Sequence, residues 1–454
     1  MSGNDFRWTL AAVARAAKGE LKGADREVTG ICTDTRKLEA GQVFVALVGE
    51  HFDGHDFIDE ACRQGAVAAV VSKPVKHDCT QILVKDTRIA LGQIAKAWRA
   101  QFVIPVIAVT GSNGKTTVKE MISDIMAVRH TTLSTQGNLN NDIGVPLTLL
   151  RLRRQHTCAV IEMGANHAGE IEWLTQLAMP SVAVVNNAGA AHLEGFGSLE
   201  GVARAKAEIY NGLMQEGTAV INADDAFAGL WQSLCTGKRM LRFGLQQPAE
   251  VSARWQAIAG GSQIDLHTPQ GDITLTLALP GRHNVMNALA ASACTLAAGA
   301  SLDEIRTGLQ AMRSVAGRLQ IKPGKAGSRI IDDTYNANPS SLRVALEVLQ
   351  QFSGRHFLAL GNMGELGADA VQLHHEAGCA ARDCGVDRLY TVGELARHAA
   401  SSFGDEAYSF GDQSSLISAL QDDLNTDVTL LVKGSRLAHM EQVVQALSTN
   451  GGAH

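Results

Sequence analysis

Short apolar runs alternate with segments of helical periodicity along most of this chain. In the middle, the run Val103 to Val109 predicts a buried strand, and apolar positions at helical spacing from Val118 to Val128 predict the helix after it. Three more apolar runs predict strands, over Thr157 to Met163, Val182 to Val185 and Ala219 to Asn222. Strands that alternate with helices predict an α/β fold with mostly parallel sheets.

The alternation restarts twice, which predicts three domains, residues 1–85, 86–316 and 317–454. A length of 454 residues fits that number, at roughly 150 residues per domain. The first domain is expected to be a small α/β unit with helices and strands at Thr9 to Ala17, Gln42 to Val48, Ile58 to Gln64 and Ala66 to Val71.

The second domain is expected to hold a central parallel sheet behind a linking helix. Besides its strands, the sequence predicts helices at Asp86 to Gln101, Ser198 to Leu213, Ala288 to Ala298 and Leu302 to Met312, and short β segments from Leu241 to Leu279.

The third domain is expected to be Rossmann-like. Its predicted elements are Ser328 to Ile331, Leu342 to Phe352, His356 to Leu360, Arg388 to Val392 and Val428 to Val432. The G-x-G-x-x-G fingerprint is absent from the sequence there, so a dinucleotide cofactor is not implied.

The stretch Gly111-Ser112-Asn113-Gly114-Lys115-Thr116-Thr117 lies between a predicted strand and a predicted helix. In that setting, backbone N–H groups and the positive end of the helix dipole point at one spot, where glycine lets an anion approach closely. Lys115 would neutralise the β- and γ-phosphates of a nucleotide, and the Thr116 hydroxyl would bind Mg²⁺. The usual pattern, G-x-x-x-x-G-K-[ST], has a longer spacing, and the alternative is an ordinary strand-to-helix turn. The threonine pair and both flanking elements favour nucleotide binding.

Two further polar residues follow predicted strands. Glu162 ends one of them, and His192 comes a few residues after another. Because active-site residues of open α/β sheets gather beyond the carboxyl ends of strands, we expect both at the same edge as the phosphate loop. A carboxylate at the end of an apolar strand is costly unless it reaches a cleft or a ligand, and Mg²⁺ prefers such oxygens. The alternatives are a solvated carboxylate and a structural histidine.

Other polar positions are less specific. Lys206 lies on a predicted helix, where a lysine is normally a solvated surface residue. Asn284 and Asn287 share one face near a predicted helix start, as caps or as ligands of adenine or phosphate. In the first domain, the clusters Thr33 to Arg36 and Gly49 to Phe57 could hold a diphosphate or a polar base, and turn chemistry explains them equally well.

Composition limits the kinds of partner and the location that we expect for this protein. The net charge is −6 without a basic run, which argues against nucleic acid. Eight scattered cysteines without a C-x-x-C pair predict reduced thiols in a cytoplasmic protein. Met1 to Leu10 has no apolar signal core, and no apolar segment reaches the ~18 residues that span a bilayer, so membrane insertion is not expected.

Six short motifs resemble the Mur ligases of bacterial cell-wall synthesis, whose superfamily includes folylpolyglutamate synthetase. The resemblance covers the whole chain, and the shortened G-x-x-G-K-[ST] loop of that family accounts for the missing glycine. The motifs are Thr110 to Thr116, Glu162 to Asn166, Asn186 to Glu194, Lys206 to Ile209, His283-Asn284 with Asn287-Ala288, and Gly317-Arg318.

The resemblance implies roles for the matching positions. Lys115 and Thr116 match the ATP-phosphate and Mg²⁺ positions, and Glu162 and His192 match metal-binding positions. Lys206 matches a lysine that family members carbamylate with CO₂, which makes it a carboxylate-like Mg²⁺ ligand rather than a surface cation. Further matches imply nucleotide contacts from Gly111, Ser112, Asn113, Gly114, Thr117, Asn284, Asn287, Arg318 and Asp333, and sugar-nucleotide contacts from Thr33, Thr35, Arg36, Asn138, Asn140 and Asn141.

Within the family, the chain is most similar to the member that adds D-alanyl-D-alanine to UDP-N-acetylmuramoyl-tripeptide. The signatures lie at Thr33 to Arg36, Gly49 to Phe57, Asp333 to Ser341 and Leu360 to Gly367. The resemblance implies an ADP-forming, ATP-dependent ligase that works through an acyl phosphate as a monomer. Its domains would hold the UDP-sugar, ATP and the dipeptide in that order.

Three alternatives remain open at this point. A sibling ligase would add another amino acid, such as diaminopimelate or lysine, although the Asp-Asn-Pro-Arg stretch expected of the diaminopimelate-adding member is absent. A nucleotide-dependent switch protein would need no acceptor. A dehydrogenase is disfavoured because the dinucleotide fingerprint is missing.

Overall fold

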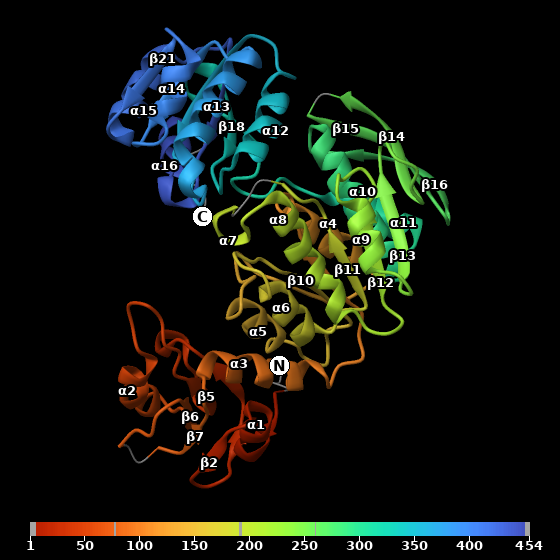
Figure 1. Ribbon diagram of the computed structural model, residues 1–454, viewed down its shortest axis with the longest axis vertical. Helices are drawn as coiled ribbons and strands as arrows, with labels where there is room; N and C mark the ends of the chain where they lie inside the picture. Colours follow the sequence, from red (N-terminus) through yellow and green to blue (C-terminus); the bar gives the residue numbers. More distant parts are fainter. Residues whose placement is uncertain (1–5, 77–78, 190–192, 259, 450–454) are drawn as a thin grey trace.

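Three α/β units follow one another along an elongated molecule (Figure 1). The computed structural model describes residues 6–76, 79–189, 193–258 and 260–449. The N-terminal unit lies at one end, the central unit occupies the middle, and the C-terminal unit lies towards the other end. The three-domain α/β architecture predicted from the sequence is confirmed. The boundaries predicted at 85/86 and 316/317 lie between secondary-structure elements and stay a prediction.

The N-terminal unit is built on a five-stranded sheet of order β2-β7-β6-β5-β4, in which β4 to β7 run parallel and β2 is antiparallel. Helix α1 begins at Leu10 because the Thr9 hydroxyl caps it by accepting a hydrogen bond from the Ala12 N–H. The elements are β1 Trp8–Thr9, α1 Leu10–Ala17, β2 Glu20–Lys22, β3 Glu27–Val28, β4 Gly30–Cys32, β5 Gln42–Val45, α2 Ile58–Arg63, β6 Ala68–Val71 and β7 Gln81–Leu83.

The central unit contains a nine-stranded sheet of order β16-β15-β14-β13-β12-β11-β8-β10-β9. It is parallel from β14 to β9 and antiparallel across β14, β15 and β16. The strands are β8 Val106–Thr110, β9 Thr132–Ser134, β10 Cys158–Glu162, β11 Val182–Val185, β12 Thr218–Asn222, β13 Arg239–Gly244, β14 Val251–Ile258, β15 Gly261–Thr268 and β16 Gly271–Leu277.

Helices cover both faces of the central sheet, because successive residues of its parallel strands point to opposite faces and both faces are apolar. Val106 and Ile161 belong to the core on the α3, α5 and α6 side, whereas Ile107 and Val160 belong to the core with α4, α10 and α11. The helices are α3 Thr87–Arg99, α4 Lys115–Ala127, α5 Gly144–Leu149, α6 Glu170–Ala178, α7 Leu193–Phe196, α8 Leu199–Ala207, α9 Ala228–Leu234, α10 Arg282–Ala297 and α11 Leu302–Ala311.

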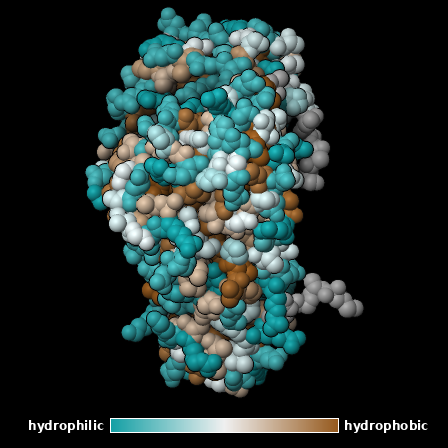
Figure 2. All heavy atoms as spheres, turned by 90° about the vertical axis from the view of Figure 1, so that its right-hand side faces the viewer, coloured by the Kyte–Doolittle hydropathy of each residue, from teal (hydrophilic) through white to brown (hydrophobic). Residues whose placement is uncertain are grey.

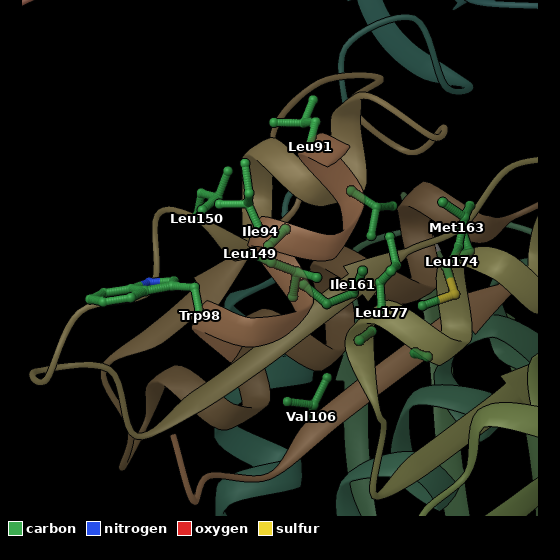
Figure 3. Packing of buried hydrophobic residues seen from close by; sticks show 14 of the residues in the cluster. Leu91, Ile94, Trp98, Val106, Leu149, Leu150, Ile161, Met163, Leu174 and Leu177 are labelled. Carbon is green, nitrogen blue, oxygen red and sulfur yellow. The ribbon is translucent and has the colours of Figure 1, made fainter. Parts of the chain in front are cut away.

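Helix α3 is the predicted linking helix between the first two units. Asp86 caps it by accepting hydrogen bonds from the Arg88 and Ile89 N–H groups. One face carries Leu91, Ile94 and Trp98, which pack among apolar residues of β8, β10, α5 and α6 (Figure 3). Because α3 also contacts α1, it attaches the N-terminal unit to the central one.

The C-terminal unit has a six-stranded sheet of order β17-β18-β22-β19-β20-β21, parallel except for β17. Leu358 and Leu431 join the core on one face, and Phe357 and Leu430 join the core on the other. The elements are β17 Gln320–Pro323, β18 Arg329–Asp333, α12 Pro339–Leu349, β19 Arg355–Gly361, α13 Ala370–Asp383, β20 Arg388–Val392, α14 Arg397–Phe403, β21 Ala407–Phe410, α15 Gln413–Asp423, β22 Val428–Lys433 and α16 Glu441–Leu447.

Several predicted boundaries differ from the structure by three residues or more, and two of these differences have a local cause. The strand predicted from Val103 begins at Val106, and Val103 itself is fully exposed, since Pro105 interrupts backbone pairing there. The helix predicted from Ala288 begins at Arg282, because Gly281 with φ +94° forms its start. In the part of the chain that the structure describes, no helix is both long and apolar enough to span a bilayer. Hydrophilic side chains cover much of the face in Figure 2, with hydrophobic ones in small groups between them.

Candidate active site

A cavity of about 1010 Å³ lies where the central and C-terminal units meet. The central unit contributes the phosphate loop and the ends of β10 and β11, and the C-terminal unit contributes the segments after β18, β19 and β22. Strands β11, β8 and β10 are neighbours in the sheet, so their carboxyl ends open onto the same edge. This is the edge at which ligands bind in open α/β sheets.

The phosphate loop connects β8 to α4 as predicted. Gly111 and Gly114 both have positive φ, +153° and +77°, a conformation that favours glycine. Gly114 forms the start of α4 without a side-chain cap, so the first N–H groups of this 13-residue helix are available to an anion. The backbone therefore has the geometry of a phosphate cradle.

Lys115 lies across this loop. Its Nζ donates hydrogen bonds to the carbonyl oxygens of Gly111 (2.8 Å) and Ser112 (3.3 Å). Burial lowers the pKa of Lys115, the nearby Arg318 lowers it further, and the carboxylates of Glu162 and Glu365 act in the opposite direction. A cation held by carbonyl oxygens, as Lys115 is among the residues that the structure describes, can exchange them for phosphate oxygens.

Asparagines behind the loop hold its shape. Asn113 N–H donates to Asn187 Oδ1 (2.9 Å), and the Asn186 and Asn187 side chains both donate to the Asn113 carbonyl (3.0 Å each). Asn186 also donates to Asn287 Oδ1 (3.0 Å), while Ser112 Oγ donates to the Gly189 carbonyl (3.0 Å). Asn186 and Asn187 were not among the predicted site residues. Their position directly after a predicted strand was the available signal.

The same loop is bonded to the C-terminal unit. Asn113 Nδ2 donates to Ser340 Oγ (2.9 Å), and Asn338 Nδ2 donates to Asn113 Oδ1 (3.1 Å). Asn338 also caps α12. Arg318 Nη2 donates to Thr116 Oγ1 (3.3 Å), and its guanidinium carbon lies 3.9 Å from the centre of the Tyr335 ring. The predicted residue Arg318 therefore reaches the phosphate loop, whereas the bracing by Asn338 and Ser340 was missed.

Glu162 is the last residue of β10 and is 2% exposed, so a solvated carboxylate is excluded. Its Oε1 accepts a hydrogen bond from Asn140 Nδ2 (2.8 Å). Its Oε2 is buried and has no hydrogen-bond partner among the described residues. Because a buried carboxylate oxygen without a partner is costly, this position fits a cation ligand. No group of three His, Cys, Asp or Glu side chains suited to a metal occurs in residues 6–76, 79–189, 193–258 and 260–449.

Lys206 is 1% exposed, so the surface position expected from its helical pattern was wrong. The helix turns this residue inward, and Nζ lies 5.3 Å from the centre of the Phe196 ring. Burial lowers the pKa of Lys206 to about 7, with a further decrease from Lys115, while Glu170 and Glu208 act in the opposite direction. Lys206 does not itself line the cavity, whereas Glu170, whose charge acts on Lys206, does.

Some of the remaining predicted site residues line the cavity and others do not. Asn284 and Asn287 line the cavity from the first turns of α10, and Asn284 Nδ2 donates to the Pro280 carbonyl (2.8 Å). They are not helix caps, because α10 begins before both. Asp333 also lines the cavity, and Lys433, 1% exposed, forms a buried ion pair with it. The loop residues Asn138, Asn140 and Asn141 line the cavity as well.

Thr33, Thr35 and Arg36 do not line the cavity and belong to the N-terminal unit. Asp34 caps the turn Thr35–Lys37 and pairs with the Arg36 guanidinium (2.9 Å), which lowers the pKa of Asp34. In the second cluster of this unit, Asp53 accepts hydrogen bonds from the backbone and ring of the buried His55. Turn chemistry therefore accounts for these contacts. His192 lies outside the described residues.

Gly114→Ala is expected to impair both the loop and the fold. An added Cβ would lie 2.6 Å from Asn287 Oδ1 and 2.7 Å from Asn186 Nδ2, and the positive φ would cost about 1–2 kcal/mol more. We expect a lower melting temperature and a KM for ATP at least about tenfold higher, measured by thermal unfolding and steady-state kinetics.

The control is Gly229→Ala, an exposed helical position with open space at its Cβ, which should be neutral or slightly stabilising. If the Gly114 variant had the melting temperature and the KM for ATP of the wild type, the loop would tolerate a side chain. That result would contradict the cradle geometry.

The fold and the site together define a nucleotide-binding α/β enzyme whose phosphate loop faces a cavity completed by a second unit. The chain matches the Mur ligase family, catalytic domain, over residues 27–99, the Mur ligase middle domain over 109–295, and the Mur ligase, glutamate ligase domain over 317–436. The chain belongs to the Mur ligase family, and it is a ligase.

Individual relatives match over nearly the full chain. It is 46% identical over 450 residues to the UDP-N-acetylmuramoyl-tripeptide--D-alanyl-D-alanine ligase of Escherichia coli (strain K12), covering 98% of this chain and 99% of that one. The structure matches MurF from Acinetobacter baumannii with a TM-score of 0.92 at 38% identity, covering 97% and 98% of the two chains. It matches the MurF ligase of Thermotoga maritima in complex with ADP with a TM-score of 0.83 at 29% identity, covering 92% and 96%.

Proposed function

We propose that this chain joins D-alanyl-D-alanine to UDP-N-acetylmuramoyl-tripeptide, consuming ATP and forming ADP, in the synthesis of peptidoglycan precursors. One observation carries the proposal. A phosphate loop with Lys115 opens into a cavity that a second α/β unit completes, in a chain 46% identical to an enzyme named for this reaction. ATP binds at Gly111 to Thr117, with Asn284, Asn287, Arg318 and Asp333 around it.

A carboxylate is a weak electrophile, so it must be activated before an amine can attack it. Transfer of the γ-phosphoryl group to the tripeptide carboxylate gives an acyl phosphate, whose phosphate is a good leaving group. The dipeptide amine attacks the carbonyl carbon, and phosphate departs with one former carboxylate oxygen. Lys115 neutralises charge on the transferring group, and Arg318, already bonded to Thr116, adds a second positive charge from the C-terminal unit. The junction of the two units excludes water that would hydrolyse the acyl phosphate.

Mg²⁺ fits the residues at the end of β10. The buried Glu162 Oε2, which has no hydrogen-bond partner in the part of the chain that the structure describes, and the Thr116 hydroxyl are hard oxygen ligands of the type this ion prefers. When bound, Mg²⁺ neutralises phosphate charge during transfer. We also assign His192 to this site from the family resemblance, although it lies outside the described residues.

We further propose that Lys206 carries a CO₂-derived carbamate. Its buried position and its pKa near 7 support this, because CO₂ reacts with the neutral amine and a pKa of about 7 makes that form abundant. The carbamate would replace the lysine cation by an anionic group whose oxygens could bind a metal ion.

The sugar-nucleotide is assigned to the N-terminal unit, with Thr33, Thr35 and Arg36 near the UDP moiety and Asn138, Asn140 and Asn141 on the facing loop of the central unit. The exposed Arg36 guanidinium supports this, because it can leave Asp34 for a diphosphate at little cost. A monomeric state and a cytoplasmic location stay predictions.

The test is a product assay. The protein is incubated with ATP, UDP-N-acetylmuramoyl-tripeptide and a panel of amine acceptors, and product masses are read. We expect one product, the tripeptide extended by D-alanyl-D-alanine, with one ADP formed per product. Extension by diaminopimelate or lysine would identify a sibling ligase instead. ATP hydrolysis that ignores every acceptor would indicate a nucleotide-dependent switch.

A further inference from the structure

Two side chains of opposite charge, Glu365 and Arg436, line the C-terminal side of the cavity. Glu365 lies in the loop after β19, and Arg436 lies in the turn after β22. These strands are parallel neighbours, with Leu360 opposite Lys433, so both loops leave the sheet at the same edge. Neither residue was a predicted site residue.

The two loops are held together. The Ser435 N–H donates to the Asn362 carbonyl (2.9 Å), and Asn362 Oδ1 accepts from the Ala396 N–H (2.9 Å). The Met363 N–H donates to Nε2 of the fully buried His374 (2.9 Å). The loop that carries Glu365 is therefore attached to β22, α13 and the segment before α14, and its position relative to Arg436 is fixed by backbone contacts.

Glu365 has an unusual backbone conformation. Its φ is +61°, in the left-handed region that a residue with a Cβ seldom adopts. The next glycine, Gly367, also has positive φ, so the chain makes a sharp turn here. Strain of this kind persists where the surroundings impose it and is concentrated at binding sites.

The loop also faces the reacting groups. The turn Gly367–Asp369 contacts α7 of the central unit, so the segment spans the junction between the two units. Glu365 is close enough to Lys115 for its carboxylate to act on the pKa of that amine. Lys115, Glu162 and Glu365 all line this cavity.

We propose that Glu365 and Arg436 bind the incoming acceptor as a zwitterion, Glu365 holding its ammonium group and Arg436 its terminal carboxylate. This rests on the proposed function, since it assumes a dipeptide acceptor. A guanidinium fork matches a carboxylate in two parallel hydrogen bonds. The side chain of Arg436 is about two-thirds exposed and, among the described residues, its one ion pair is a long contact to Glu441 (3.7 Å), so it can reorient towards a ligand. With Glu365 near Lys115, the amine is placed beside the carboxyl group to be activated.

The first test separates acceptor binding from activation. Glu365→Gln and Arg436→Gln are each expected to raise the KM for D-alanyl-D-alanine on the order of 10- to 100-fold, the effect of losing a charge-assisted hydrogen bond. The KM values for ATP and UDP-N-acetylmuramoyl-tripeptide should not change. With hydroxylamine in place of the dipeptide, hydroxamate formation should fall far less than dipeptide ligation in both variants, because the two residues are proposed to hold the acceptor, and Glu365 acts on Lys115 only through its charge.

Matched controls are Glu376→Gln and Arg343→Gln, two exposed positions of the same unit that do not line the cavity. Both should have wild-type kinetics. Glu365→Asp adds a readout that a structural role would not produce. It keeps the carboxylate, so its KM for the dipeptide should rise less than that of Glu365→Gln, at an unchanged melting temperature.

The second test matches each residue to one end of the ligand. Replacing the dipeptide by D-alanyl-D-alaninamide should raise KM for the wild type, and Arg436→Gln should use acid and amide equally well. Unchanged dipeptide KM in both variants, or an equal loss of hydroxamate formation, would overturn the proposal. A wild-type protein that forms neither dipeptide product nor hydroxamate would instead overturn the proposed ligase reaction itself.

Discussion

Lys115→Ala is expected to lower kcat by about 100- to 1,000-fold or more, because it removes the cation that neutralises the transferring phosphoryl group. The fold should remain intact, since the hydrogen bonds of Lys115 Nζ within the described part of the chain go to the Gly111 and Ser112 carbonyls of its own loop. The measurements are steady-state product formation, circular dichroism and thermal unfolding. The variant should retain the secondary structure and the cooperative transition of the wild type.

The matched control for this experiment is Lys325→Ala, which removes an exposed lysine away from the cavity and should keep wild-type kcat. Near-normal turnover in the Lys115 variant would refute the role of the loop as the ATP-phosphate site. A collapse of the thermal transition would show that Lys115 acts through folding instead.

Lys206→Ala is expected to lose most activity, on the order of 100-fold or more, if its carbamate supplies a ligand to the metal. Added short carboxylates such as acetate should restore part of that activity, because they can occupy the space of the missing carbamate. For the wild type, activity should fall when CO₂ is removed from the buffer. This loss of wild-type activity should be greater below pH 7. There the Lys206 amine, with a pKa of about 7, is protonated and no longer reacts with CO₂.

The lowered pKa of Lys206 also makes the free energy of unfolding depend on pH. The folded state holds the proton of Lys206 less tightly than the ordinary value of 10.5, so the unfolded state binds more protons between pH 7 and 10.5. Stability of the uncarbamylated protein therefore decreases as the pH falls through that range. The control, Arg204→Ala, removes an exposed cation of the same helix that pairs with Glu200, and should be near neutral. Activity independent of CO₂, with no rescue by carboxylates, would contradict the carbamate.

The strand–loop–helix unit around Gly111 could be predicted because its signals are local. β-branched runs, glycines and helical spacing depend on neighbours in sequence, and β8 and α4 formed within a few residues of their predicted bounds. The predicted start of α10 failed for a local reason as well. An apolar pattern beginning at Ala288 does not reveal that Gly281 starts the helix and buries Asn284 in its first turn.

Lys206 illustrates a limit of periodicity. A helical pattern shows which residues share a face, but not which second element covers that face. In this chain, α8 is covered so that Lys206 is 1% exposed beneath Phe196, whereas Arg204 two residues earlier stays at the surface. Only the family resemblance, and not the spacing, indicated a special lysine.

The sequence by itself determined the phosphate loop, the alternation of strands and helices and the division into three α/β units, because each rests on contacts between near neighbours in the chain. The tertiary structure decided which strand ends became adjacent and therefore which polar groups met. It brought Glu162 beside the loop, joined Asn113 to Ser340 over 227 positions, and set Glu365 and Arg436 on one edge. These contacts depend on strand order and on the packing of one unit against another, which no local pattern encodes.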